Sequence, residues 1–283
     1  MKAILLPTDF SKNSLNAIDY AMELFKDETC DFYFLNIQKA SSFVSDDLMT
    51  MSSSTTIYQT LIDTAKKSIE NVIKTIKDYY QNDKHTFHSC VDYDNFIDGI
   101  NQMCDAVNID LIVMGTKGAT GAERVLFGSN TVRVMQRCST PVLAIPDGCK
   151  FVGLNSIAFA SDYLTHYNEA DLESMINMAM HHNAKIDVVH MLQQEHLSED
   201  QENNRAFLDS IISNVTHEFV TLEQQDIFEV IQKYIEDNNI KMLAMMNKKY
   251  SFLERLFSQH NVEVFGFKIN VPFLVMENTG QKS

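Results

Sequence analysis

The sequence has no tryptophan, and it has no apolar run close to the roughly 20 residues that a membrane-spanning helix needs. Its first apolar stretch, residues 3–6, is too short for the hydrophobic region of a signal peptide, and no small-residue cleavage site follows it. We therefore expect neither a membrane partner nor export.

Cysteine is also sparse, and its pattern excludes two common uses. The count of five is odd, the spacings are scattered and no C-x-x-C motif occurs. These features argue against a disulfide framework or a zinc site and favour reduced thiols in the cytoplasm. The positions are Cys30, Cys90, Cys104, Cys138 and Cys149.

Basic residues are fewer than acidic residues. The chain has 23 Lys and Arg against 38 Asp and Glu, a formal net charge of −15 and a pI near 4.9. This balance argues against nucleic acid or an anionic membrane as the main partner. It does not argue against ATP, because a local cradle of backbone N–H groups can bind phosphate on an acidic protein.

The most informative stretch follows residues 109–114, an apolar run that predicts a buried strand. A loop with glycines comes next, and residues 130–137 then have a helical pattern. Glycines let the backbone approach an anion, and the first turn of a helix offers free N–H groups. Ser129 and Thr131 add hydroxyl groups at that turn. Strand, glycine loop and helix start together predict a nucleotide site.

The spacing of this loop is specific. Gly115, Gly118 and Gly128-Ser129 read G-x2-G-x9-G-S. No Lys-Ser/Thr pair follows the last glycine, as a Walker A loop would require, and the glycines are too far apart for the dinucleotide fingerprint. The motif resembles the ATP-binding motif of the universal stress protein family, G-x2-G-x9-G-(S/T).

The amino-terminal segment adds a second motif. Residues 2–7 predict a central strand, and a helix is expected over 12–26 with Ser11 as its N-cap. Asp9 lies between them, where parallel sheets bind ligands beyond the carboxyl ends of their strands. Asp9 could equally be a turn or capping residue. Pro-Thr-Asp-Phe-Ser at residues 7–11 resembles the opening of universal stress proteins.

The second half repeats the first. Asp162 follows a strand pattern 153 residues after Asp9, and three later strand patterns are echoed in the same order. The alternation of strands and helices predicts an α/β fold. Strands are expected at 2–7, 31–37, 85–91, 109–115, 141–146, 155–161, 185–191, 217–222, 240–246 and 271–276. Helices are expected at 12–26, 57–81, 93–107, 129–138, 166–182, 198–214, 225–238 and 251–262.

The layout resembles two tandem universal stress protein domains, 1–147 and 151–283. The resemblance implies two Rossmann-like domains, each a five-stranded parallel sheet flanked by helices. It also implies that residues 141–146 pair with 272–277 of the same chain, an intramolecular pseudo-dimer that leaves room for a homodimer as well. Such pairing would protect two apolar edge strands.

The second half lacks the glycine cradle. Met246 and Lys249 stand where Gly115 and Gly118 stand in the first half. Ser258-Gln259 replaces the Gly-Ser pair. A Cβ at these places blocks close backbone approach and disfavours positive φ. We therefore expect the second half to be structural or to bind another partner.

The family motif also implies which residues touch ATP, with or without Mg²⁺. Adenine and ribose would meet Pro7, Thr8, Asp9, Ile37, Met114 and Gly115. The phosphates would meet Gly118, Gly128, Ser129, Asn130 and Thr131. Asn130 would add a donor or only cap the helix. No metal site is expected, since His85 and His88 lack matched carboxylates in sequence.

Residues 39–56 are long and rich in Ser and Thr after the second strand. They predict a disordered loop, with a flap near the adenine as the alternative.

The sequence favours binding over turnover. The predicted cradle has no P-loop lysine, evident base or arginine finger, so no catalytic residue is assigned. Slow ATP hydrolysis or autophosphorylation stays open. The alternatives are an interaction module with a vestigial nucleotide site, and an ATP-using enzyme of the wider nucleotide-binding α-hydrolase type.

Overall fold

The structure, a computed structural model, describes most of the chain. The described residues are 1–38, 51–93, 95–116, 127–164, 166–191, 196–222, 227–247 and 270–278.

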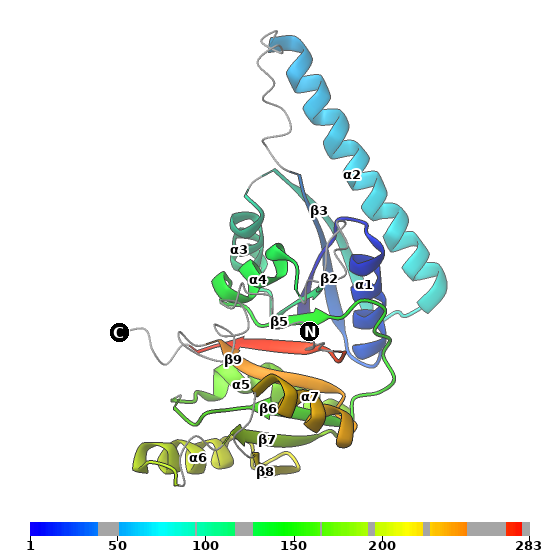
Figure 1. Cartoon of the computed structure of the whole chain (residues 1–283). Helices are drawn as coiled ribbons and strands as arrows, with labels where there is room; N and C mark the ends of the chain where they lie inside the picture. The colour runs from blue at the N-terminus through cyan, green and yellow to red at the C-terminus, as the bar shows by residue number, and fades with distance from the viewer. Residues whose placement is uncertain are drawn as a thin grey trace.

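The described strands form one ten-stranded sheet in the order β3-β2-β1-β4-β5-β10-β9-β6-β7-β8 (Figure 1). Each half therefore arranges its strands the same way, around β1 in the first half and β6 in the second. Apolar runs fill the central strands, as expected where helices cover both faces. The strands are β1 (Lys2–Pro7), β2 (Cys30–Ile37), β3 (His85–Asp92), β4 (Leu111–Gly115), β5 (Val142–Ile145), β6 (Ser156–Ala160), β7 (Lys185–Met191), β8 (His217–Leu222), β9 (Met242–Asn247) and β10 (Phe273–Glu277).

Helices pack on both faces of this sheet. Residues of α1, α2, α5 and α6 share one buried apolar core, and residues of α3, α4 and α7 share the other. In β1, Ile4 and Leu6 belong to the first core and Leu5 to the second, because alternate side chains of a strand face opposite ways. The helices are α1 (Lys12–Leu24), α2 (Met51–Tyr80), α3 (Phe96–Val107), α4 (Ser129–Arg137), α5 (Glu169–His182), α6 (Glu199–Ile211) and α7 (Ile227–Asp237).

The two halves join through β5 and β10. These strands are antiparallel, and Leu143 lies opposite Leu274 in their register. All other pairings in the sheet are parallel. The pairing predicted between residues 141–146 and 272–277 is confirmed. Both cores run across this junction, since each contains residues of both halves.

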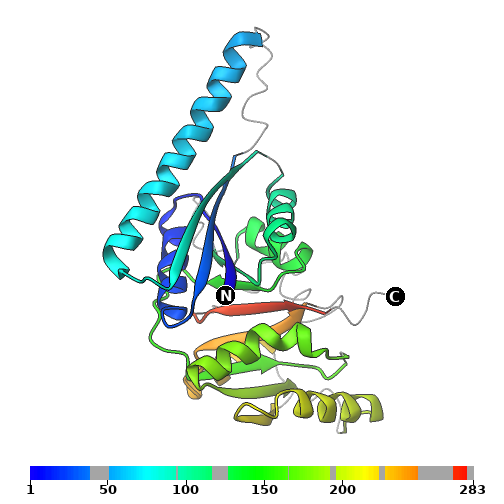
Figure 2. The same cartoon turned by 180° about the vertical axis from the view of Figure 1, so that it is seen from behind.

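The ten predicted strands are all present, with ends within two residues of the prediction. The largest error concerns α2, a helix of 30 residues that starts at Met51 rather than at residue 57 and projects from the molecule (Figures 1 and 2). Residues 51–56 are helical, so the loop predicted there is wrong. Ser and Thr cost only a few tenths of a kcal/mol each when an established helix extends through them. Residues 39–50 and the helix predicted at 251–262 lie outside the described residues.

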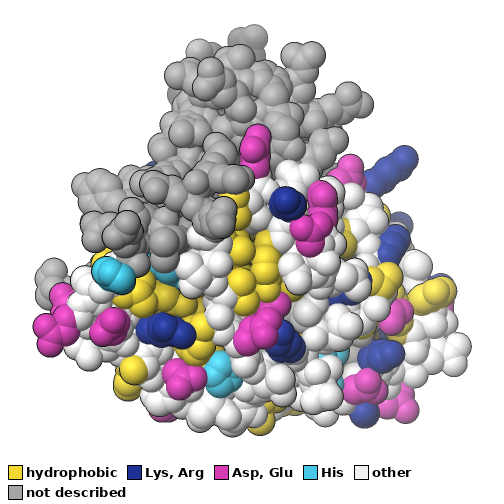
Figure 3. All heavy atoms as spheres, turned by 60° about the horizontal axis from the view of Figure 1, so that its bottom comes forward, with side chains coloured by type: hydrophobic (Ala, Val, Ile, Leu, Met, Phe, Trp, Pro, Cys, Tyr) yellow, Lys and Arg dark blue, Asp and Glu magenta, His cyan; other side chains and the backbone are white. Residues whose placement is uncertain are grey.

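Within the described part of the chain, no helix combines the length and hydropathy that crossing a membrane would need. On the face at the bottom of Figure 1, acidic and basic side chains are interspersed around a strip of hydrophobic ones (Figure 3). Among its described residues this mixture gives no single-sign field that would attract a polyanion.

Candidate functional site

The predicted site residues lie at the carboxyl ends of three adjacent strands. In the sheet β1 lies between β2 and β4 and runs parallel to both. Pro7, Ile37 and Gly115 are the last residues of β1, β2 and β4. Because the ends of parallel neighbours share one edge of the sheet, Asp9 and the start of the glycine loop lie at the same edge, as expected.

The turn from β1 to α1 is held by its own side chains. Phe10 has a φ of 61°, and its N–H donates to the hydroxyl of Thr8 at 3.1 Å. The N–H of Ser11 donates to Oδ1 of Asp9 at 3.0 Å, and Asn36 of β2 donates to the carbonyl of Thr8 at 2.7 Å. Thr8 is buried while Asp9 is exposed. Asp9 therefore has a turn role in this structure, in addition to any contact with a ligand.

Gly115 has a packing reason for being glycine. A Cβ at this position would lie 2.9 Å from both Cγ and the carbonyl oxygen of Asn13 in α1. Contacts this short to a backbone atom are not relieved by a rotamer change. The lack of a side chain at Gly115 is therefore explained by the close approach of α1 to the backbone there.

The start of α4 is fastened to the end of β4. The N–H of Gly128 donates to the carbonyl of Thr116 at 2.6 Å. The buried hydroxyl of Thr131 donates to the carbonyl of Gly115 at 3.0 Å. Ser129 and Asn130 are exposed on the first turn between these two anchors. Of the two residues whose hydroxyls are expected to contact phosphate, Thr131 uses its hydroxyl in a structural bond, and Ser129 is exposed.

The amino terminus of α4 differs from the other helix starts whose caps are described. Side chains cap α1, α3, α5 and α6, and these are Ser11, Asn95, Asn168 and Ser198. At α4 the N-cap is Gly128, which makes no side-chain bond, and the first turn contains no acidic residue. Its N–H groups and the positive end of the helix dipole therefore suit an anion.

The remaining predicted contacts fall into two groups. Met114 is 6 % exposed and its side chain belongs to the core, so its predicted contact with a nucleotide would be made by its backbone. Ile37 is half-buried. Gly118 lies outside the described residues.

The second half reproduces the first turn of the site. Tyr163 has a φ of 55°, and its N–H donates to the hydroxyl of Ser161 at 3.0 Å. The N–H of Leu164 donates to Oδ1 of Asp162 at 2.9 Å. His190 of β7 takes the place of Asn36 and donates from Nδ1 to the carbonyl of Ser161 at 3.0 Å. This turn is conserved within the chain even though the glycine cradle is not.

Side chains of β7 and α6 cover the turn at Asp162. The ring of Tyr163 stacks on His190 at 4.5 Å, and both residues are buried. Gln201 and Asn204 of α6 donate to the carbonyls of Asp162 and Tyr163, each at 2.8 Å. Sequence reasoning singled out Asp162 but missed His190 and these two amides. Only the position of His190 at a strand end, matching Asn36, could have indicated its role.

Other reactive groups are either buried or paired. All five cysteines are free, and burial raises the pKa of the Cys30 and Cys138 thiols to about 12. A thiol with so high a pKa is a poor nucleophile. His88 pairs at 3.3 Å with Asp31, a carboxylate that the sequence pattern did not place beside it. Among the described residues, no cluster of three metal-ligating side chains occurs.

Comparison with known proteins gives a consistent result for the first half. Residues 1–146 match the universal stress protein family. Universal stress protein MJ0531 of Methanocaldococcus jannaschii is 29 % identical over 144 residues, which cover 51 % of this chain and 81 % of that protein.

Solved structures extend the likeness to the whole chain. A universal stress protein from Archaeoglobus fulgidus has a TM-score of 0.65 at 16 % identity and covers 98 % of this chain and 96 % of its own. The cytoplasmic domain of a prokaryotic cation chloride cotransporter has a TM-score of 0.55 at 10 % identity, covering 100 % and 98 %. At these identities the likeness concerns the fold, and the second example shows that the fold occurs in a different kind of protein.

Proposed function

Because this chain belongs to the universal stress protein family, we propose that its first half binds ATP and that binding, rather than turnover, is its function in the cytoplasm. The observation that carries the proposal is the start of α4. This helix start has no side-chain cap and no acidic residue in its first turn. It lies at the carboxyl end of β4, on the edge of the sheet that β4 shares with β1 and β2. The loop before it has the G-x2-G-x9-G-S spacing. That combination suits a nucleotide phosphate.

The proposed contacts divide by the part of ATP that they meet. Adenine and ribose would lie beside the ends of β1, β2 and β4, at Pro7, Thr8, Asp9, Ile37, Met114 and Gly115. The phosphates would lie at the glycine loop and the first turn of α4, at Gly118, Gly128, Ser129, Asn130 and Thr131. Since the hydroxyl of Thr131 donates to Gly115, its share of the phosphate contact is its backbone N–H. If Mg²⁺ accompanies ATP, Asp9 is a carboxylate at this edge that would suit it.

The second half is proposed to be a structural partner of the first rather than a second ATP site. Its turn carbonyls accept bonds from Gln201 and Asn204, and Met246, the last residue but one of β9, stands in place of glycine. The pairing of β5 with β10 would make the chain an intramolecular pseudo-dimer.

The test replaces Gly128, whose backbone at φ −64° and ψ 152° accepts any residue. Gly128→Asp puts a capping carboxylate where the phosphate would lie, whereas Gly128→Asn caps the helix without charge. Calorimetric titration with MgATP should show one site per chain, weakened at least about tenfold by Asp and much less by Asn, because like charges repel at close range.

Thermal unfolding provides the control for this pair of variants. Asp or Asn at an N-cap is as stabilising as Gly or slightly more so. Both variants should therefore unfold at or above the temperature of the original protein. Equal ATP affinity in all three proteins would contradict the proposed site. No binding by the original protein at millimolar ATP would instead favour an interaction module with a vestigial site.

A further inference from the structure

The helix that begins at the proposed phosphate site is held at both ends by the other half of the chain. At its start, the ring of Phe127 packs on Phe273 of β10, with centroids 5.6 Å apart. Phe127 directly precedes the N-cap Gly128 and is 5 % exposed, and Phe273 is fully buried. This contact joins the end of the glycine loop to the carboxyl-terminal strand, more than 100 residues away.

At the other end of α4, Asn247 of β9 donates from Nδ2 to the carbonyl of Met135 at 2.9 Å. Met135 lies in the last turn of α4, where carbonyls run out of N–H donors from the helix itself. Asn247 therefore acts as a cap on the C-terminus of α4 from the second half. It is the last residue of β9, one position after the Met246 that replaces the first glycine of the cradle.

Between the two ends, the buried side of α4 belongs to a core that both halves build. Val134 and Met135 of α4 share this core with Phe273 and Val275 of β10 and Met245 of β9. The first half also holds α4, through the bonds from Gly128 and Thr131 to the end of β4 and through packing against α3 and β5. The second half adds one contact near each end of the helix, at Phe127 and at Met135.

We infer that the second half positions the phosphate-facing helix, and that Asn247 and Phe273 are positioning residues for nucleotide binding in the first half. This inference rests on the proposed function for its consequence in affinity, but the anchoring of α4 can be measured without a nucleotide. The inference gives the second half a role. That half lacks the glycine motif in its sequence, and it would stabilise the phosphate-facing helix of the first half. Because a helix dipole acts on an anion only over its first turn, a small shift of α4 would weaken phosphate binding.

The first experiment compares two amides that make the same bond at different helices. Asn247 donates to a carbonyl near the end of α4, and Asn238 donates to the carbonyl of Tyr234 near the end of α7 at 3.0 Å. Asn247→Ala should raise the Kd for MgATP about three- to tenfold, whereas Asn238→Ala should leave it unchanged. Asn247→Asp keeps the shape but removes the donor and should behave like Ala. Asn247→Gln keeps the donor and should recover most of the affinity.

The second measurement is amide hydrogen exchange of residues 128–135 in the nucleotide-free protein. Exchange there should speed up in Asn247→Ala and in Phe273→Ala, relative to exchange in β1 of the same protein. Leu274→Ala is the control for Phe273, because it removes a fully buried side chain of the same strand that belongs to the opposite core. It should change exchange in α4 no more than exchange in β1.

The outcomes separate the two claims. Unchanged exchange in α4 for both Asn247→Ala and Phe273→Ala would overturn the positioning inference, whatever the ATP affinity. Faster exchange together with an unchanged Kd would overturn the link from helix position to affinity. If the original protein binds no ATP, the proposed function fails, and exchange alone still decides whether the second half holds α4.

Discussion

At the scale of single residues, the two halves show which features of the site need a ligand to explain them. Asp9 and Asp162 accept the same backbone bond, from the residue two positions later, at 3.0 and 2.9 Å. The second half keeps this turn without the glycine cradle. An aspartate in this position is therefore explained by local turn chemistry, and the case for a ligand rests on the start of α4.

A buried histidine makes stability depend on pH. His85 is 8 % exposed and donates from Nε2 to the carbonyl of Phe25 at 3.1 Å. Burial lowers its pKa below the ordinary value of 6.5, against the opposing effect of that bond. A lowered pKa means that the folded state prefers the neutral ring, so its stability is full above about pH 6.5 and decreases as pH falls.

We expect His85→Gln, which keeps a donor but cannot take up a proton, to lose less thermal stability than the original protein between about pH 7.5 and pH 5.5. Unfolding temperatures measured by circular dichroism at several pH values give the comparison. His88→Gln is the control, because His88 pairs with Asp31 at 3.3 Å and is partly exposed. Parallel pH curves for the original and the His85 variant would show that burial of this ring carries no pH dependence.

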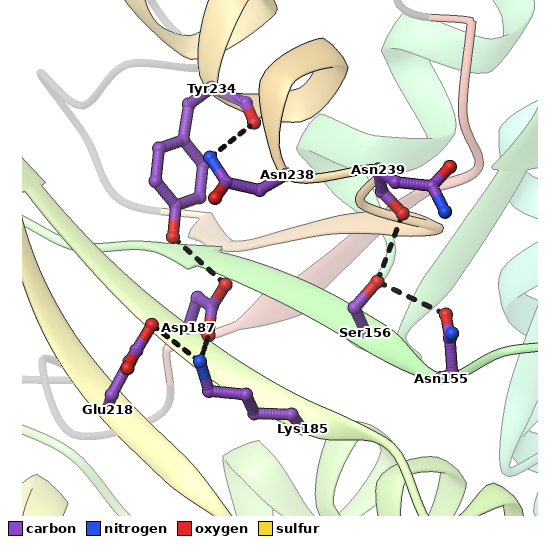
Figure 4. Close-up of polar contacts among 8 residues, drawn as sticks. All are labelled: Asn155, Ser156, Lys185, Asp187, Glu218, Tyr234, Asn238 and Asn239. Atoms are coloured by element: carbon purple, nitrogen blue, oxygen red, sulfur yellow. Dashed lines mark hydrogen bonds and ion pairs between the residues drawn. The ribbon is translucent and has the colours of Figure 1, made fainter.

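At the scale of elements, α7 is fastened to the sheet by a charged network (Figure 4). The hydroxyl of Tyr234 in α7 donates to Oδ2 of the buried Asp187 at 2.9 Å. Lys185 bridges Asp187 at 3.0 Å and Glu218 of β8 at 2.5 Å. Burial and this bond raise the pKa of Tyr234, which therefore stays protonated and a donor at neutral pH.

Tyr234→Phe should lower the free energy of unfolding by about 1–3 kcal/mol, because it removes a hydrogen bond to a charged group while leaving the ring in place. Urea unfolding at neutral pH measures the change. Tyr79→Phe removes a hydroxyl from a ring that is 78 % exposed and should have almost no effect. Equal costs for the two substitutions would mean that the Tyr234 hydroxyl contributes nothing through Asp187.

The elements also show where sequence reasoning succeeds and where it stops. Short apolar runs such as residues 111–115 predict strands well, because a strand covered on both faces has to be apolar throughout. The start of α2 was missed because Ser and Thr suit both loops and extended helices. The contacts that shape the site, such as Asn13 against Gly115 and Asn247 on α4, join residues about 100 apart and leave no periodic signal. The contact residues predicted for ATP, including Gly118 in the undescribed loop, stay a prediction.

At the scale of the whole molecule, the junction between the halves is continuous core rather than a surface contact. Leu143 and Leu274 are fully buried, lie opposite each other across β5 and β10 and belong to one core that includes residues of α1 and α5. Interfaces between domains usually resemble transient protein contacts and allow relative motion. A shared core of this kind predicts instead that the two halves unfold together.

Leu274→Ala tests that prediction, because its expected cost of about 2–5 kcal/mol arises at the junction and belongs to neither half alone. If the halves form one cooperative unit, hydrogen exchange under mild denaturant should accelerate equally in β2 and β7, which lie far from the junction on opposite sides of it. Calorimetry should then show a single transition that moves to lower temperature. Two separate transitions, or acceleration confined to β7, would show instead that each half folds around its own core and that the β5–β10 pairing is only a contact between finished domains.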